Sequence, residues 1–215
     1  MKQPGRLAGW LTLVGLLALL NYAGRATSGK PDRNVLYHYG SAVGAVVEFA
    51  FILGVVLALA GSDRRKMLAL RRPRSVGGAF LGGSGVIVAI YLLSAALDPL
   101  LHPGREQGLT PTHWEPAHAG AYAANFLVIA LFGPFVEEVT FRGLGYALFL
   151  PYSSTLAVLG TGVTFGLAHG LVEALPLLVA LGVLLALLRR YTDSVYPGMV
   201  VHGLFNAIAL VVAVA

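Results

Sequence analysis

Long apolar stretches are the feature that most restricts how this chain of 215 residues can fold. A helix rises 1.5 Å per residue, so about 20 apolar residues span a hydrocarbon core of roughly 30 Å. Inside a bilayer, such a segment has to satisfy its own backbone hydrogen bonds. The sequence therefore predicts an all-α, polytopic transmembrane bundle of about seven helices, at 7–23, 37–60, 76–97, 119–150, 153–170, 171–188 and 197–215.

The composition agrees with a membrane protein and shows no soluble part. Hydrophobic residues make up 57% of the chain and charged residues only 12%, against about 25% charged residues in soluble domains. The mean hydropathy is +0.76. We predict one transmembrane domain over residues 1–215, with a catalytic core at about 119–215.

The basic charge predicts topology and excludes nucleic acid as a partner. The net charge is +5 and the pI is about 9.7, but the basic residues lie in short loops beside apolar segments, as cytoplasmic loops do. Alternate loops carry ten basic residues on one side (Lys2, Arg6, Arg64, Arg65, Lys66, Arg71, Arg72, Arg74, Arg189, Arg190) and four on the other (Arg25, Lys30, Arg33, Arg105). This places the N-terminus inside. The short loops and small size favour a bacterial cytoplasmic (inner) membrane.

The cysteine count limits the available chemistry. The chain has no cysteine, which excludes a disulfide framework, thiolate metal ligands and a cysteine nucleophile. Catalysis would have to use Glu, His, Asn, Ser or water.

Three charges interrupt the apolar segment at 119–150. An ionisable group near the bilayer centre costs about 2.5–3.5 kcal/mol, so each needs a partner or a function. On a helix, Glu138 and Arg142 share a face and predict a mutually neutralising pair, whereas Glu137 points about 100° away and is left for chemistry. Glu48, in the second span, is interpreted instead as a carboxylate satisfied by a neighbouring helix.

Two later spans add polar groups with the same spacing of four residues. Phe165 and His169 share one helical face, and His202 and Asn206 share another. A single histidine in a bundle is usually a hydrogen-bonded core residue, but three helices that each carry such groups favour a site. The set suits hydrolysis, because a carboxylate and an imidazole can deprotonate water while an imidazole and an amide donate to an oxyanion.

These motifs resemble those of a known family. Glu-Glu-x-x-x-Arg at 137–142, Phe-x-x-x-His at 165–169 and His-x-x-x-Asn at 202–206, in that order, are similar to the three motifs of the CPBP intramembrane proteases. That family includes the CAAX prenyl endopeptidases and the bacteriocin-processing or immunity proteins of the Abi group. The resemblance covers about 126–207, including Phe141-Arg142-Gly143 and Tyr196-Pro197-Gly198.

The resemblance implies roles for these residues. Glu137 and His169 would activate water, and His202 and Asn206 would stabilise the oxyanion. Glu138, Arg142 and Phe165 would support the site. The implied activity is cleavage of a peptide bond in a membrane-associated or exported protein or peptide, with the lipid bilayer as the surroundings.

The need for a metal stays open at this stage. The family has been described both as metalloprotease and as glutamate-type protease, and Glu137, His169 and His202 would supply the ligands of a catalytic Zn²⁺ site. No His-Glu-x-x-His helix fixes two ligands on one face, and Asn206 is a poor zinc ligand, which favours water activation without a cofactor.

Other functions and one topological problem remain. A transporter would also carry buried charges, and a non-catalytic scaffold or immunity protein would keep the same fold. Along straight helices Glu137 and His202 fall near the inner side, but His169 falls near the outer side. Either the helix breaks at Gly133-Pro134, or 153–188 dips into the membrane and returns.

Overall fold

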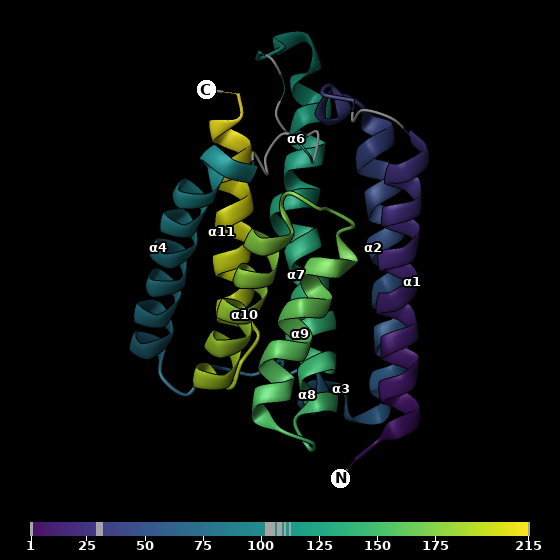
Figure 1. Ribbon diagram of the computed structural model, residues 1–215, viewed down its shortest axis with the longest axis vertical. Helices are drawn as coiled ribbons and strands as arrows, with labels where there is room; N and C mark the ends of the chain where they lie inside the picture. The colour runs from purple at the N-terminus through teal and green to yellow at the C-terminus, as the bar shows by residue number, and fades with distance from the viewer. Residues whose placement is uncertain are drawn as a thin grey trace.

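The described residues form helices and no strand, which confirms the all-α prediction (Figure 1). The computed structural model describes residues 2–28, 32–101, 106, 109, 111 and 113–214; two of the predicted outer basic residues, Lys30 and Arg105, lie outside them. The first half contains α1 Pro4–Ser28, η1 Val35–Tyr37, α2 Tyr39–Ala60, η2 Gly61–Asp63, α3 Arg64–Met67 and α4 Val76–Leu101.

A continuous helical run at the centre carries the glutamates. It extends over 34 residues from Pro116 to Phe149 and consists of η3 Pro116–His118, α6 Ala119–Leu127, the π-helical η4 Val128–Phe132, α7 Gly133–Glu138, the π-helical η5 Val139–Gly145 and α8 Tyr146–Phe149.

The predicted break at Gly133-Pro134 is wrong. Gly133 keeps helical angles, with φ −56° and ψ −58°. Pro134 lacks an N–H and its ring needs room, but the turn before it widens to the π form, which accommodates the ring without ending the helix.

The alternative, that 153–188 dips in and returns, agrees with a hairpin in the structure that enters and leaves the bundle at one end. It consists of α9 Ser154–Ala168 and α10 Leu175–Thr192, which pack side by side. Its tip lies near half the height of the bundle in Figure 1. At 15 residues α9 is only about 22 Å long, which is shorter than the hydrocarbon core, so His169 at its end lies short of the far surface.

The tip of this hairpin is held by α1. Asn21 Nδ2 donates to the Ala168 carbonyl at 2.8 Å, and the Tyr22 hydroxyl donates to the Leu171 carbonyl at 3.2 Å. Gly170 between them has a φ of +63°, and a Cβ there would lie 2.6 Å from Asn21 Cβ. The backbone groups at the tip are thus satisfied by protein, as burial in a membrane requires.

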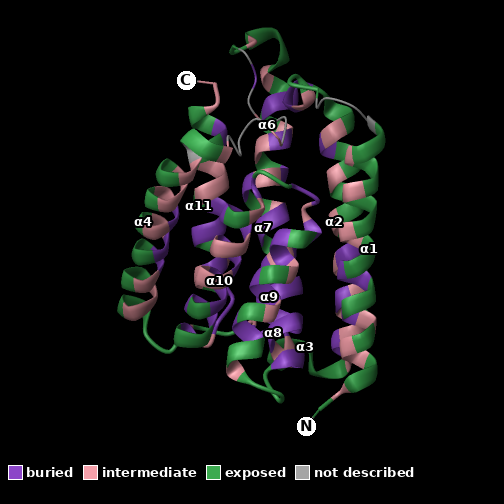
Figure 2. Ribbon diagram, in the orientation of Figure 1, coloured by how far each residue is buried: buried purple, intermediate pink, exposed green. Residues whose placement is uncertain are grey.

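Exposed apolar side chains cover the outside of the bundle, while the core lies around α7, α9 and α10 (Figure 2). Phe51, Phe80 and Leu92 are each about two-thirds exposed or more, at 66%, 72% and 67%. Five helical segments are long and apolar enough to cross a membrane. α11 Tyr196–Val212 completes the bundle against α4 and α10. The chain is an integral membrane protein.

Candidate active site

The pair of Glu138 and Arg142 anchors the site, with the geometry predicted from the sequence. Arg142 Nη1 donates to Glu138 Oε1 at 2.8 Å, and both side chains are fully buried. Arg142 Nη2 donates to the carbonyl of Gly182 in α10 at 3.1 Å. One guanidinium therefore neutralises a carboxylate and ties the central helix to the hairpin.

The second oxygen of Glu138 faces the first turn of α11. A Cβ on Gly198 would lie 2.4 Å from Glu138 Oε2, so only glycine leaves room for the carboxylate here. This oxygen has no hydrogen-bond partner among the described residues. The positive end of the α11 dipole stabilises the buried negative charge.

His202 lies between the two carboxylates. Its Nδ1 is 3.3 Å from Glu138 Oε1, and its Nε2 is 3.5 Å from Glu137 Oε2. The ring is 3% exposed, whereas the Glu137 side chain is 19% exposed. Glu137 is therefore the more accessible of the two carboxylates, and His202 links it to the neutralised pair behind it.

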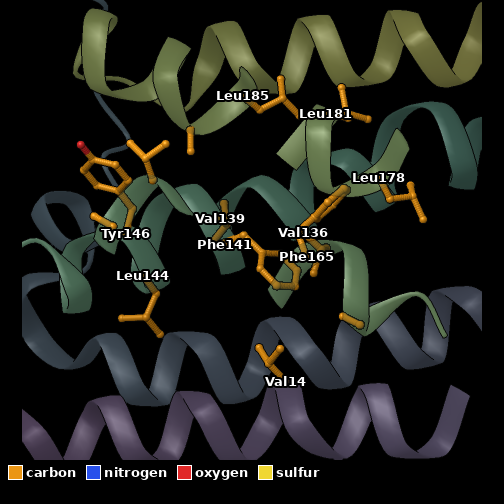
Figure 3. Packing of buried hydrophobic residues seen from close by; sticks show 14 of the residues in the cluster. Val14, Val136, Val139, Phe141, Leu144, Tyr146, Phe165, Leu178, Leu181 and Leu185 are labelled. Atoms are coloured by element: carbon orange, nitrogen blue, oxygen red, sulfur yellow. The ribbon is translucent and has the colours of Figure 1, made fainter. Parts of the chain in front are cut away.

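Phe165 packs at the centre of these groups. Its ring is fully buried and meets the rings of His169, Phe141 and His202 edge-on, with centroids 4.6, 5.3 and 5.6 Å away. The Arg142 guanidinium carbon lies 4.3 Å from the centre of the ring, a cation–π distance. Figure 3 shows Phe165 beside Val136 and Phe141. The Phe165 ring therefore packs against three polar side chains, those of His169, His202 and Arg142.

His169 caps α9, and one of its ring nitrogens is already used. Its Nδ1 lies 2.8 Å from the Phe165 carbonyl. Because a carbonyl only accepts, Nδ1 carries the hydrogen and donates. In the neutral ring, Nε2 then holds a lone pair that can accept a proton.

Asn206 is oriented by the π-helical turn. The Gly133 N–H donates to the Val128 carbonyl, one residue further back than in an α-helix. The Ile129 carbonyl, which would accept this hydrogen bond in an α-helix, is therefore left available. Asn206 Nδ2 donates to that carbonyl at 2.9 Å. The amide has two N–H groups, so one remains for a ligand.

Two hollows meet at Glu137 and His169, which line both. The larger, of about 460 Å³, is also lined by His202 and Asn206 and is otherwise mostly apolar, with leucines of α10 prominent in its wall. The smaller, of about 190 Å³, lies toward α1 and α2 and includes Asn21 and Glu48. An apolar cavity with a few convergent polar groups is the usual form of a ligand site.

All four predicted catalytic residues therefore line one cavity, and the three predicted supporting residues lie behind it. Sequence reasoning missed the parts played by three further residues. Asn21 contributes a side-chain amide, Gly182 contributes a backbone carbonyl, and Gly198 leaves free space. Sequence reasoning also interpreted Glu48 as satisfied by a neighbouring helix. In the described residues Glu48 has no hydrogen bond or ion pair, and it faces the smaller hollow beside Glu137.

The positions of the three candidate zinc ligands can be compared with a metal site. Among the described residues, no group of three His, Asp or Glu side chains is arranged to hold a metal ion. Both ring nitrogens of His202 face carboxylates, and His169 Nδ1 faces a carbonyl. The Nδ1 contacts with Glu138 and with the Phe165 carbonyl are those that the second ring nitrogen of a metal-binding histidine usually makes, so they leave both Nε2 atoms available.

The fold and the site together define a polytopic helical membrane protein with a carboxylate and histidine site at mid-depth. Residues 119–208 match the family model of the type II CAAX prenyl endopeptidases, described as Rce1-like. This match confirms the resemblance to the CPBP and CAAX proteases over the segment that carries the motifs. No curated protein and no solved structure matches the chain.

The family match supports the general class of activity. The activity that the match supports is that of an intramembrane endopeptidase of the CAAX type, which acts on a protein substrate. The matched segment begins at the start of α6 and ends within α11, and it includes all seven site residues predicted from the sequence but not Asn21 or Glu48.

Proposed function

We propose that this protein hydrolyses a peptide bond within the membrane, using water activated by Glu137 and His169. The observation that carries the proposal is the shared cavity. Glu137, His169, His202 and Asn206 line one hollow of about 460 Å³ beside a buried, neutralised Glu138–Arg142 pair.

The reaction follows from these positions. Glu137 or His169 Nε2 takes a proton from water, and the water oxygen forms a bond to the peptide carbonyl carbon. The oxyanion accepts hydrogen bonds from the free N–H of Asn206 and from His202 Nε2, which at 3.5 Å is only loosely held by Glu137. The C–N bond then breaks, and the proton passes from the same base to the leaving amine.

Water and substrate have separate places in this arrangement. The smaller hollow has polar groups from Asn21, Glu48 and Thr140 and reaches the same two catalytic groups. It suits water. The larger hollow has a mostly apolar wall and suits an extended segment of a membrane-associated or exported protein.

The proposal requires no metal. Glu137, His169 and His202 are the metal ligands that the sequence suggested, and among the described residues no three His, Asp or Glu side chains are grouped to hold an ion. We further infer an N-terminus inside and a bacterial cytoplasmic membrane, which rest on loop charge and chain size.

The first test is cleavage of a membrane-peptide library by the purified protein in detergent. Wild type, Glu137→Gln, His169→Ala and Glu173→Gln would be compared, each with and without a zinc chelator. Glu173 is exposed and lines neither hollow, so its substitution is the matched control. We expect the first two variants to lose activity by about 10²–10⁴-fold, while the control and the chelated wild type cleave normally.

Other outcomes identify the rival functions. Activity that disappears with chelator and returns with zinc would make His169 and His202 ligands. An identical product pattern from wild type and from every variant would come from a contaminant, and a non-catalytic scaffold or a transporter would then be favoured.

A further inference from the structure

A third hollow lies away from the candidate active site, at the end of the bundle where the N-terminus, α3 and α8 are found (Figure 1). Its volume is about 530 Å³. It is bordered by α3, the loop before α4, the α8–α9 turn and the end of α10. None of the catalytic groups lines it.

The lining of this hollow is strongly basic. Five cations face two carboxylates: Lys66, Arg71, Arg74, Arg189 and Arg190 against Asp63 and Asp193. In the described part of the chain, Lys66 and Arg190 have no ion-pair or hydrogen-bond partner. Both are exposed. The cavity therefore keeps an excess of unpaired positive charge.

Asp193 arranges the arginines in advance. It accepts hydrogen bonds from Arg71 Nη2 at 2.6 Å and from Arg189 Nη1 at 2.9 Å, and Arg74 Nη2 lies 3.9 Å away. Burial raises the pKa of the Asp193 carboxyl, but the hydrogen bonds and charges of Arg71 and Arg189 outweigh it and lower the pKa below its ordinary value. The ionised carboxylate fixes the guanidinium groups around it.

Arg189 adds a buried N–H group that lacks a hydrogen-bond acceptor among the described residues. Its side chain is only 6% exposed, and its Nε has no hydrogen-bond partner. Its guanidinium lies over the Tyr146 ring at 5.2 Å. A buried donor without a partner is unfavourable, and because Arg189 lines this cavity an anion bound there can accept its hydrogen bond.

The position and the remaining lining identify the anion. The apolar helices α2, α4 and α10 begin or end beside this hollow, which places it at the membrane boundary. Met67, Leu148, Leu150 and Pro151 form an apolar wall next to the cations. Basic pockets between transmembrane helices bind phosphate-bearing lipid headgroups. We infer that this cavity binds the phosphate headgroup of an anionic phospholipid, whose glycerol and acyl groups lie along the apolar wall.

The test measures lipid binding to the delipidated full-length protein in a neutral detergent, by native mass spectrometry and by the thermal unfolding midpoint. Phosphatidylglycerol, phosphatidylcholine and inorganic phosphate would be added separately. We expect phosphatidylglycerol to bind and to raise the midpoint, and the other two to do neither. Equal protection by inorganic phosphate would show a site for free anions, and equal binding of phosphatidylcholine would show no headgroup selectivity; either result overturns the proposal.

Two double variants test the location of the site. Lys66→Ala with Arg190→Ala removes the two unpaired cations, and Arg65→Ala with Arg72→Ala removes equal charge from the same end without touching the cavity. We expect the first to weaken phosphatidylglycerol binding by about 30-fold and the second to leave it unchanged. Equal losses in both would mean general surface attraction and would refute a defined site.

Discussion

The buried arginine is the residue on which the site depends most. Arg142 contacts Glu138, the Gly182 carbonyl and the Phe165 ring, which belong to three different helices. Its Nε has no hydrogen-bond partner among the described residues, so even this well-placed group is incompletely satisfied. A buried pair of this kind contributes little net stability, but losing one partner is expensive.

Replacing Arg142 by methionine should therefore destabilise the protein. Arg142→Met leaves the Glu138 carboxylate buried without its cation, and we expect a loss of about 3–5 kcal/mol in the free energy of unfolding. Chemical unfolding in detergent, followed by circular dichroism, measures it. Arg65→Met is the control, because Arg65 is exposed and has no ion pair in the described residues. An unchanged unfolding midpoint for Arg142→Met would show that Glu138 is neutralised by other means.

At the scale of elements, the hairpin of α9 and α10 decides whether the proposed catalytic groups meet. His169 reaches the depth of Glu137 only because α9 stops after 15 residues, at a glycine with positive φ. The tip is then fixed against α1 through Asn21 and Tyr22. The position of the His169 imidazole is thus set by contacts between residues that are 147 and 149 positions apart in the sequence.

Substituting Gly170 should reduce activity without removing any catalytic group. Gly170→Ala puts a Cβ at a φ of +63° and within 2.6 Å of Asn21 Cβ, so the tip and the adjacent His169 must move. We expect kcat to fall by about 10²-fold, as for a displacement of about 1 Å, measured with the best substrate from the peptide library. Gly15→Ala, where an added Cβ meets nothing within 4 Å, should cleave normally. Equal rates for both variants would show that the tip does not position His169.

At the scale of the whole molecule, the larger cavity at the site is lined by helices from the whole bundle. It is formed by residues from α1 to α11, and Ala209 lines it one turn beyond Asn206. On the proposed function, the substrate segment fits this space beside Glu137, so we expect the shape of the cavity to act on substrate affinity rather than on the chemical step.

Filling the cavity should therefore act on substrate binding. We expect Ala209→Trp to raise KM by about tenfold or more while kcat changes little, because the substitution removes binding common to the ground state and the transition state. Steady-state kinetics on the library substrate measures both constants. Ala50→Trp places the same ring on an exposed position of α2 outside the cavity and should change neither. A lower kcat with unchanged KM in Ala209→Trp would place the substrate elsewhere.

The sequence predicted the parts of this architecture that depend on local periodicity. Spacing by four residues was enough to pair Glu138 with Arg142, because helical neighbours are fixed by geometry. Hydropathy could not describe the hairpin of α9 and α10, since a helix of 15 residues and a helix of 18 residues that qualifies as a span are both apolar in composition. The π-helical turns that free the Ile129 carbonyl, and the close approach of Gly198 to Glu138, depend on tertiary packing and have no local signal.

The contact between α1 and the hairpin tip also has a consequence for biosynthesis. The ribosome makes α1 long before it makes α9 and α10, so Asn21 and Tyr22 are in the membrane before the carbonyls of Ala168 and Leu171 arrive. Those carbonyls would otherwise face hydrocarbon, which strongly disfavours insertion of the tip. The first helix is therefore available as a docking partner for the tip, and we expect the hairpin to reach its final position only after α1 is in place.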